Sequence, residues 1–162
     1  MKSIYILRHA KSDWSDDSVD DKDRILNKRG EDEAKKVAKF LVNNKLSFDA
    51  IIASPAQRAL QTATIVKKST SFLKEIQVEE CFYFSDLRRI ISVIRRVSDD
   101  VEKLLIVGHN PLWSNLVLFL TGKRMTLDTG CVAVLSADFD KWEHFDDLQF
   151  NLDHLFNPKE VK

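Results

Sequence analysis

Three short apolar runs of this chain each end in a polar cluster that carries histidine or arginine. The clusters are Arg8-His9-Ala10, Ser54-Pro55-Ala56-Gln57-Arg58 and Gly108-His109-Asn110-Pro111. A neutral imidazole nitrogen is a competent nucleophile near neutral pH. The planar guanidinium fork of arginine donates two parallel hydrogen bonds to a phosphoryl group. Together these residue types predict phosphoryl transfer through a histidine.

Each polar side chain has an expected role in that chemistry. His9 is predicted to attack phosphorus in line and to form a phosphohistidine enzyme that water then hydrolyses. Arg8, Arg58 and His109 are expected to bind the phosphoryl oxygens and to neutralise their charge, with Asn110 as a further substrate-binding residue. The sequence has neither a Walker-type glycine loop nor the Cys/His spacing of a zinc site. We therefore expect no metal and no other cofactor.

Each cluster also has a purely structural interpretation when it is taken alone. An Arg-His pair after a strand is more often structural than catalytic, and a Ser-Pro-x-x-Arg segment is mostly a capped helix with a solvated arginine. A Gly-His-Asn-Pro segment is about as often only a capped helix start. The three occur in order along one chain, each after a predicted strand, and this joint occurrence favours a common anion site.

Hydrophobic periodicity predicts the elements that must position these clusters. Buried strands are predicted over 3–8, 49–53, 103–107 and 131–136, with a shorter one near 76–79. Amphipathic helices are predicted over 29–44, about 55–68, 86–97 and about 111–120. Segment 142–156 is predicted to hold a short helical turn and then a strand near 149–155. Thr129-Gly130 precedes the strand over 131–136 and is predicted to be a plain turn, with an approach to the anion site as the alternative.

Strands that alternate with helices imply βαβ units and a largely parallel sheet covered on both faces. Parallel strands end at one edge of the sheet, where ligands bind in open α/β folds. Ser54 and Asn110 are expected to cap helices that have proline at the first position, while Asn27 caps the helix over 29–44 and Gly122 ends the helix over 111–120. Arg58 then lies in a first helical turn, whose unpaired N–H groups favour an anion.

Composition narrows the class of protein. The 162 residues, 44% apolar and 31% charged, fit one globular domain over 1–162. Lys plus Arg equals Asp plus Glu at 25 each, so the electrostatic footprint of a nucleic-acid binder is missing. No apolar stretch is long enough to span a membrane or to form a signal-peptide core. The two cysteines make no disulfide framework. We expect a cytoplasmic monomer without nucleic-acid or membrane partners.

The motifs LRHA (7–10), SPAQRALQTA (54–63) and VGHNP (107–111) resemble the histidine phosphatase superfamily, also called phosphoglycerate-mutase-like. Within it the chain is most similar to small bacterial SixA-type phosphohistidine phosphatases, a likeness that includes DRILNKRG (23–30), DTGCVAVL (128–135) and LFNPK (155–159). The resemblance implies an α/β three-layer sandwich, with a mostly parallel central sheet, an antiparallel edge strand and helices on both faces. It also implies that His9 is the nucleophile, that Arg8 and Arg58 bind phosphoryl oxygens, and that His109 is the second pocket histidine.

Two features depart from the family pattern. Ala10 stands where the first motif usually has glycine, and alanine fits there without strain only if its φ angle is negative. Larger members of the family carry an acidic proton donor after the second motif. The nearest candidates for this general acid are Glu79 and Glu80, for which the polar end of a strand is an equally good interpretation.

The lack of a clear general acid in the sequence affects which substrate is expected. An alkoxide leaving group needs protonation by a general acid, whereas imidazole, with a pKa of about 6.5, departs far more readily. The short chain also offers little material for a cap over the pocket. We therefore predict a phosphatase that removes phosphoryl groups from phosphohistidine on proteins. The alternatives are a phosphomonoesterase for small phosphate esters and, less favoured because both histidines and both arginines are present, a phosphate-binding module without turnover.

Overall fold

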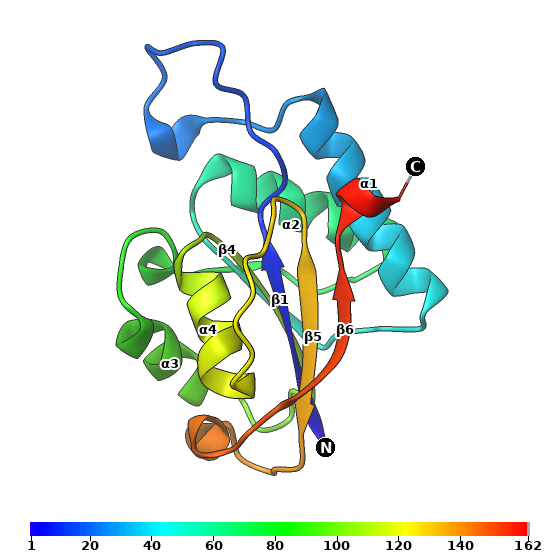
Figure 1. Cartoon of the computed structure of the whole chain (residues 1–162), viewed down its shortest axis with the longest axis vertical. Coiled ribbons are helices and arrows are strands. Elements are labelled where there is room, and N and C mark those ends of the chain that lie inside the picture. The colour runs from blue at the N-terminus through cyan, green and yellow to red at the C-terminus, as the bar shows by residue number, and fades with distance from the viewer. Residues whose placement is uncertain (162) are drawn as a thin grey trace.

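The computed structural model describes residues 1–161, which form a six-stranded sheet between two layers of helices (Figure 1). The strands, in their order across the sheet, are β3 (Gln77–Val78), β2 (Ala50–Ala53), β4 (Lys103–Gly108), β1 (Lys2–Arg8), β5 (Val132–Ala137) and β6 (Asn151–Phe156). Strands β3, β2, β4 and β1 run parallel, and β5 is antiparallel to both β1 and β6. The predicted α/β fold with a mostly parallel sheet is confirmed, and the reversed strand lies one place inside the edge.

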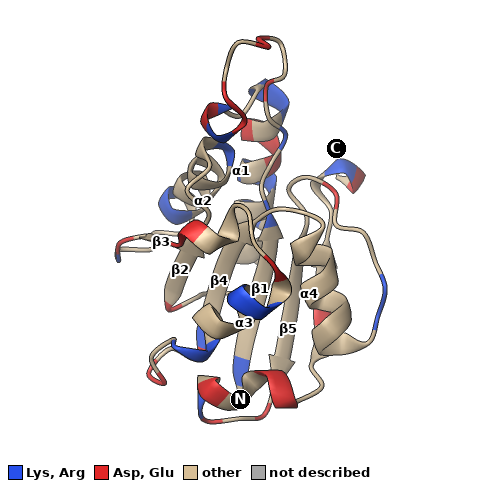
Figure 2. Cartoon of the chain, turned by 90° about the vertical axis from the view of Figure 1, so that its left-hand side faces the viewer, with Lys and Arg blue, Asp and Glu red and all other residues tan. Residues whose placement is uncertain are grey.

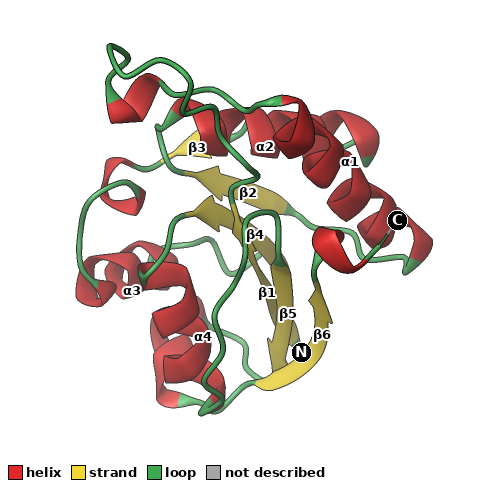
Figure 3. Cartoon of the chain, turned by 45° about the horizontal axis from the view of Figure 1, so that its top comes forward, coloured by secondary structure: helices red, strands yellow, loops and turns green. Residues whose placement is uncertain are grey.

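Helices cover both faces of the sheet, as Figure 3 shows. They are α1 (Lys28–Asn43), α2 (Gln57–Ser69), α3 (Leu87–Arg95) and α4 (Leu112–Thr121). Successive side chains of a strand point to opposite faces. In β1, Tyr5 and Leu7 accordingly pack in the core formed with α1 and α2, whereas Ile4 and Ile6 pack in the core formed with α3 and α4. Burial on both faces explains why β1 reads as a continuous apolar run.

The carboxyl ends of β1, β2 and β4 lie together along one edge of the sheet, the edge that runs across the strands. Arg8 at the end of β1 pairs in register with Gly108 of β4, and Ala53 of β2 pairs with Val107. The reversed strand β5 begins at this edge, where its first residue pairs with Leu7. The loop that precedes β5 therefore arrives beside the loops that follow β1, β2 and β4.

The start of α2 differs from the prediction. The helix begins at Gln57 with Ala56 as its extended N-cap residue, so Ser54 and Pro55 lie outside it. Ser54 does not cap the helix; its Oγ accepts a hydrogen bond from the amide of Ala56 at 3.2 Å. A residue before proline is driven towards extended conformations, which keeps Ser54 in line with β2. Arg58 still lies in the first turn of α2, as expected.

The start of α4 is displaced in the same direction, because Leu112 is its first residue and Pro111 its N-cap. The predicted cap at Asn110 is therefore wrong by one position, although Asn110 Oδ1 does accept a hydrogen bond from the amide of Ser114. The other predicted helix ends are confirmed. Asn27 caps α1 by accepting from the amide of Gly30, and Gly122 ends α4 with a left-handed φ of 74°.

The C-terminal segment agrees with its prediction of a helical turn followed by a strand: a 3₁₀ helix, η3 (Trp142–Asp147), precedes β6. Between β1 and α1 a long loop projects beyond the sheet at the top of Figure 1 and contains the 3₁₀ helix η1 (Asp21–Asp23). In Figure 2 acidic and basic segments are interspersed over the ribbon. Within residues 1–161, no helix is long and apolar enough to cross a membrane.

Candidate active site

A cavity of about 490 Å³ opens where the strand ends meet. Its walls come from the loop after β1, the first turn of α2, the segment after the 3₁₀ helix η2 (Glu80–Phe82), and the loops before α4 and β5. Arg8, His9, Arg58, His109 and Asn110 all line this cavity. The edge of the sheet thus brings together every residue that the sequence assigns to catalysis or to phosphoryl binding, apart from the two acid candidates.

The imidazole of His9 is neutral and points one ring nitrogen at the backbone. Its Nδ1 lies 2.7 Å from the carbonyl oxygen of Ala10, and a carbonyl can only accept, so Nδ1 carries the proton and Nε2 keeps a lone pair. Burial, more than any neighbouring charge, lowers the pKa of His9 to about 3. At neutral pH the side chain is therefore in the form that a nitrogen nucleophile needs.

His109 lies beside His9, with 5.0 Å between the centroids of the two rings. Its Nε2 is 2.8 Å from Oγ of Ser54, so Ser54 supports the second histidine instead of capping α2. Burial first, and then the positive charge of Arg58, lowers the pKa of His109 to about 4. Both rings are thus neutral at physiological pH, and they leave the arginines as the positive charges of the cavity.

Two guanidinium groups face the histidines. Nη1 of Arg8 donates to the carbonyl oxygen of Leu127 at 2.9 Å, while its Nε is buried and has no hydrogen-bond partner among residues 1–161. Arg58 donates from Nη1 to the carbonyl oxygen of Asp21 at 2.6 Å and from Nη2 to Asp21 Oδ2 at 3.0 Å. A guanidinium has five N–H donors, so Arg58 can hold Asp21 and still offer donors to an oxyanion.

Asp21 is a cavity residue for which the sequence analysis predicts no role. Besides its contacts with Arg58, its Oδ2 accepts a hydrogen bond from the hydroxyl of Tyr83 at 2.7 Å. Partial burial would raise the pKa of Asp21, but the hydrogen bonds from Tyr83 and Arg58 outweigh it and lower the pKa below its ordinary value. At neutral pH Asp21 is an ionised carboxylate that orients Arg58 and has no proton to give.

Neither candidate for a general acid, Glu79 or Glu80, is among the residues that line the cavity. The Glu80 side chain is 77% exposed, and its Oε2 lies 3.4 Å from Nζ of Lys22. Glu79 precedes η2, and its amide extends the β2–β3 pairing by donating to the carbonyl of Ala53 at 3.0 Å. The structure therefore brings neither glutamate to the histidines.

Asn110 lines the cavity but is also engaged with its surroundings. Its Nδ2 donates to the carbonyl oxygen of Leu127 at 2.8 Å, the same oxygen that binds Arg8. Its Oδ1 accepts from the amide and the hydroxyl of Ser114 in α4. Asn110 thus fixes the loop that holds Arg8, in addition to any contact with a ligand.

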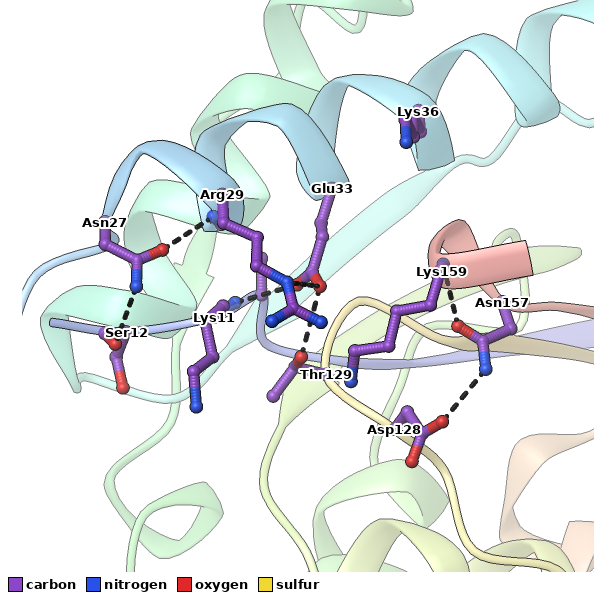
Figure 4. A network of polar contacts seen from close by, with 12 residues as sticks. Lys11, Ser12, Asn27, Arg29, Glu33, Lys36, Asp128, Thr129, Asn157 and Lys159 are labelled. Carbon is purple, nitrogen blue, oxygen red and sulfur yellow. Dashed lines mark hydrogen bonds and ion pairs between the residues drawn. The ribbon is translucent and has the colours of Figure 1, made fainter. Parts of the chain in front are cut away.

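The buried carboxylate of Glu33 contacts two residues that line the cavity, Lys11 and Thr129, and Figure 4 shows these contacts. Oε1 of Glu33 accepts from the amide of Lys11 at 2.9 Å, and its Oε2 lies 3.4 Å from the hydroxyl of Thr129 and 3.7 Å from Nε of Arg29. Thr129, predicted to be part of a plain turn, also lines the cavity. Glu33 therefore connects α1 to two of the loops that form the cavity wall.

Two small residues make this close packing feasible. Ala10 is fully buried and has no positive φ, so alanine is accommodated in the loop without backbone strain. Gly130 has a φ of 76°, and its amide donates to the carbonyl oxygens of Arg8 and His9. A Cβ at Gly130 would come within 2.9 Å of the Pro158 ring and 3.2 Å of Glu33, so only glycine fits here.

The chain is similar to known proteins in sequence and in fold. Residues 4–83 match the family model of the histidine phosphatase superfamily (branch 1). An uncharacterized protein of Mycobacterium leprae is 31% identical in an alignment 153 residues long, which covers 86% of this chain and 92% of that protein. Among solved structures, the protein histidine phosphatase SixA complexed with tungstate is similar with a TM-score of 0.85, 22% identity and 99% coverage of both chains. The α-ribazole phosphatase from Shigella flexneri is similar with a TM-score of 0.71, 18% identity and 96% coverage of both chains.

Proposed function

The chain belongs to the histidine phosphatase superfamily, and from this premise we propose that it removes phosphoryl groups from phosphohistidine on proteins through a phosphoenzyme on His9. One observation carries the proposal. A neutral His9 with a lone pair on Nε2 lines the same cavity as the guanidinium groups of Arg8 and Arg58. This combination joins a nucleophile to the charges that a transferring phosphoryl group requires.

The reaction has two steps. In the first, Nε2 of His9 forms a bond to phosphorus while the bond from phosphorus to the substrate imidazole breaks, and that imidazole leaves with its electron pair. In the second, the oxygen of water forms a bond to phosphorus while the bond from Nε2 of His9 to phosphorus breaks. Nε2 takes back its electron pair, the proton stays on Nδ1 so that His9 is neutral again, and inorganic phosphate leaves with the two protons of the water. Arg8 and Arg58 stabilise the charge on the equatorial oxygens in both steps. A bound oxygen also supplies a partner for the buried Nε of Arg8.

The state and position of three carboxylates, Asp21, Glu79 and Glu80, indicate which leaving group is favoured. Asp21 is ionised, and Glu79 and Glu80 do not line the cavity. Without a positioned acid, a leaving group of low basicity such as imidazole is favoured over an alkoxide. This supports phosphohistidine as the substrate.

Exposed side chains at the opening of the cavity favour a large substrate. Trp14 is 56% exposed and Phe84 is 76% exposed, and both line the cavity. Exposed aromatic side chains around a polar pocket are typical of surfaces that bind another protein. A phosphohistidine on a protein brings such a surface with it, whereas a small phosphate ester does not.

A small phosphate ester is the second candidate substrate. The likeness to α-ribazole phosphatase favours it, since that neighbour is named for an ester substrate. Rates on a phosphohistidine-bearing protein and on a sugar phosphate such as glucose 6-phosphate, whose leaving group is an alkoxide, separate the two when they are measured side by side. We expect a much larger kcat/KM for the phosphohistidine protein, and comparable values would contradict the proposal.

The phosphoenzyme is tested by trapping. Wild type and His9→Ala are mixed with a ³²P-labelled phosphohistidine protein, quenched in alkali and separated by size. We expect alkali-stable, acid-labile label on the wild type and none on His9→Ala. Equal labelling of the two proteins would refute His9 as the nucleophile.

A further inference from the structure

We propose that Glu33 is a positioning residue that orients the imidazole of His9 through the peptide group between Ala10 and Lys11. The inference rests on the proposed function, which makes His9 the nucleophile. Glu33 is 4% exposed and is not among the residues that line the cavity, so it acts on the reaction through other groups. The expectations drawn from the sequence assign it no role.

The two ends of a single peptide group carry the connection. The carbonyl oxygen of Ala10 lies 2.7 Å from Nδ1 of His9, and the amide of Lys11 lies 2.9 Å from Oε1 of Glu33. That carbonyl and that amide belong to the same planar unit, whose atoms move together. A carboxylate that fixes the amide therefore also fixes the acceptor that holds the imidazole.

The charge of Glu33 adds to this geometric effect. A hydrogen bond to a carboxylate is stronger than one to a neutral acceptor, and hydrogen bonds in a chain polarise one another in a buried setting. Polarisation of the peptide group makes the carbonyl oxygen of Ala10 a better acceptor for the Nδ1–H of His9. The proton is held on Nδ1, and the lone pair of Nε2 is kept for attack.

Glu33 is itself held in place by several groups. The hydroxyl of Thr129 and the guanidinium of Arg29 approach its Oε2 (Figure 4). Gly130 leaves room for its side chain, because a Cβ on Gly130 would come within 3.2 Å of the Cβ of Glu33. These contacts come from two places along the chain: α1 and the loop before β5. The carboxylate is thus a fixed point against which the peptide group is set.

The test compares Glu33→Gln and Glu33→Ala with wild type. Glutamine keeps the size and an acceptor oxygen but removes the charge, and alanine removes both. We expect phosphoenzyme formation to slow about 10-fold to 100-fold, the loss typical when a partner that orients a functional histidine is removed, with the larger loss in Glu33→Ala. The dissociation constant for tungstate is expected to change by no more than about threefold, because Glu33 does not touch the oxyanion. Glu31→Gln, an exposed change on the same helix, is the control and should match wild type.

A spectroscopic readout tests the relay without any substrate. The ¹⁵N signals of His9 report which ring nitrogen carries the proton, and we expect the Nδ1–H form in wild type and a mixture of both forms in Glu33→Gln. If Glu33→Gln keeps both the wild-type rate and the wild-type ¹⁵N signals, the relay is refuted. If rate, tungstate binding and melting temperature fall together, Glu33 is merely structural. Should wild type fail to turn over phosphohistidine, the proposed function fails while the ¹⁵N comparison still decides the relay.

Discussion

At the scale of the residue, burial decides which groups of the cavity are charged. His9 and His109 are buried side by side, and the pKa of each lies well below its ordinary value, at about 3 and about 4. Arg8 and Arg58 keep their charge because a guanidinium does not deprotonate in proteins. The neutral ring of His9 therefore carries a lone pair on Nε2, and the positive charge of the cavity comes from the arginines.

Arg58 lies in the first turn of α2, lines the cavity and holds Asp21, so its removal tests the binding of the phosphoryl group. Arg58→Ala is expected to lower kcat about 10²-fold to 10³-fold, or about 3 kcal/mol, as for loss of an oxyanion donor. Arg58→Lys should recover only part of this loss, because an ammonium lacks the planar fork. Steady-state kinetics on a phosphohistidine protein measure both. Full activity in Arg58→Ala would mean that the phosphoryl group binds elsewhere.

Asp21 allows a test of its own, since an orienting carboxylate and a proton donor predict different losses. Asp21→Asn keeps an acceptor oxygen for Arg58, so we expect kcat to fall less than about tenfold and the alkaline side of the pH profile to stay unchanged. A proton donor at this position would instead cost about 10²-fold to 10⁴-fold. The pH dependence of kcat from pH 5 to 9 distinguishes the two, with Asp20→Asn as the neighbouring control.

At the scale of the element, three successive amides after β1 are each bound by a different part of the fold. The amide of His9 donates to the Gly108 carbonyl of β4, that of Ala10 to the Thr62 hydroxyl of α2, and that of Lys11 to Glu33 of α1. The loop that carries His9 has no unsatisfied amide over these residues. Its conformation is fixed by packing of the surrounding elements, and not by its own sequence.

A prediction about these elements concerns the hydroxyl of Thr62, which accepts from the amide of Ala10. Thr62→Val has nearly the same shape but leaves the buried amide of Ala10 without an acceptor, which should cost about 1–3 kcal/mol of unfolding free energy. Thr64→Val is the matched control, because Thr64 is exposed on the same helix. Its hydroxyl donates to the carbonyl of Leu60, as the hydroxyl of Thr62 donates to the carbonyl of Arg58. Urea unfolding of both variants measures the difference. Equal losses would show that the hydroxyl of Thr62 does not hold the loop.

Sequence patterns predict the strands well here because both faces of each central strand are buried, which produces compact apolar runs. They place Arg8, His9 and His109 at one sheet edge by the rule for parallel strands. They miss Asp21 because it stands in a loop rich in aspartate, where nothing local marks the one carboxylate that reaches Arg58. They miss Glu33 although a signal exists: it shares the apolar face of α1 with Val37 and Leu41, at spacings of four residues.

At the scale of the whole molecule, the two buried histidines couple stability to pH. A histidine whose pKa is lowered on folding binds fewer protons in the folded state than in the unfolded state between the two pKa values. The stability contributed by keeping it neutral is present above the unfolded pKa of about 6.5 and is lost as pH falls towards the folded pKa. His9 and His109 both act in this direction, over the range from 6.5 down to about 3 and about 4.

The corresponding prediction concerns acid unfolding. Wild type is expected to lose unfolding free energy steadily from pH 7 to pH 4, and His109→Asn to lose less over the same range because one of the two groups is gone. His144→Asn removes an exposed histidine and should retain the wild-type dependence. Urea midpoints at intervals of half a pH unit measure the slopes. Identical slopes in wild type and His109→Asn would contradict the neutral state assigned to that ring.

The central position of β1 has a consequence for the order in which the site can form. Of the six strands, β1 comes first along the sequence and ends at Arg8, directly before His9, yet its two partners in the sheet are β4 and β5, which end at Gly108 and Ala137. Until those strands are synthesised, both edges of β1 are open, and Arg8 has neither the Leu127 carbonyl nor the Gly130 amide beside it. A chain synthesised only as far as Arg58 therefore lacks β4, β5 and the loops that complete the cavity, including His109 and Thr129.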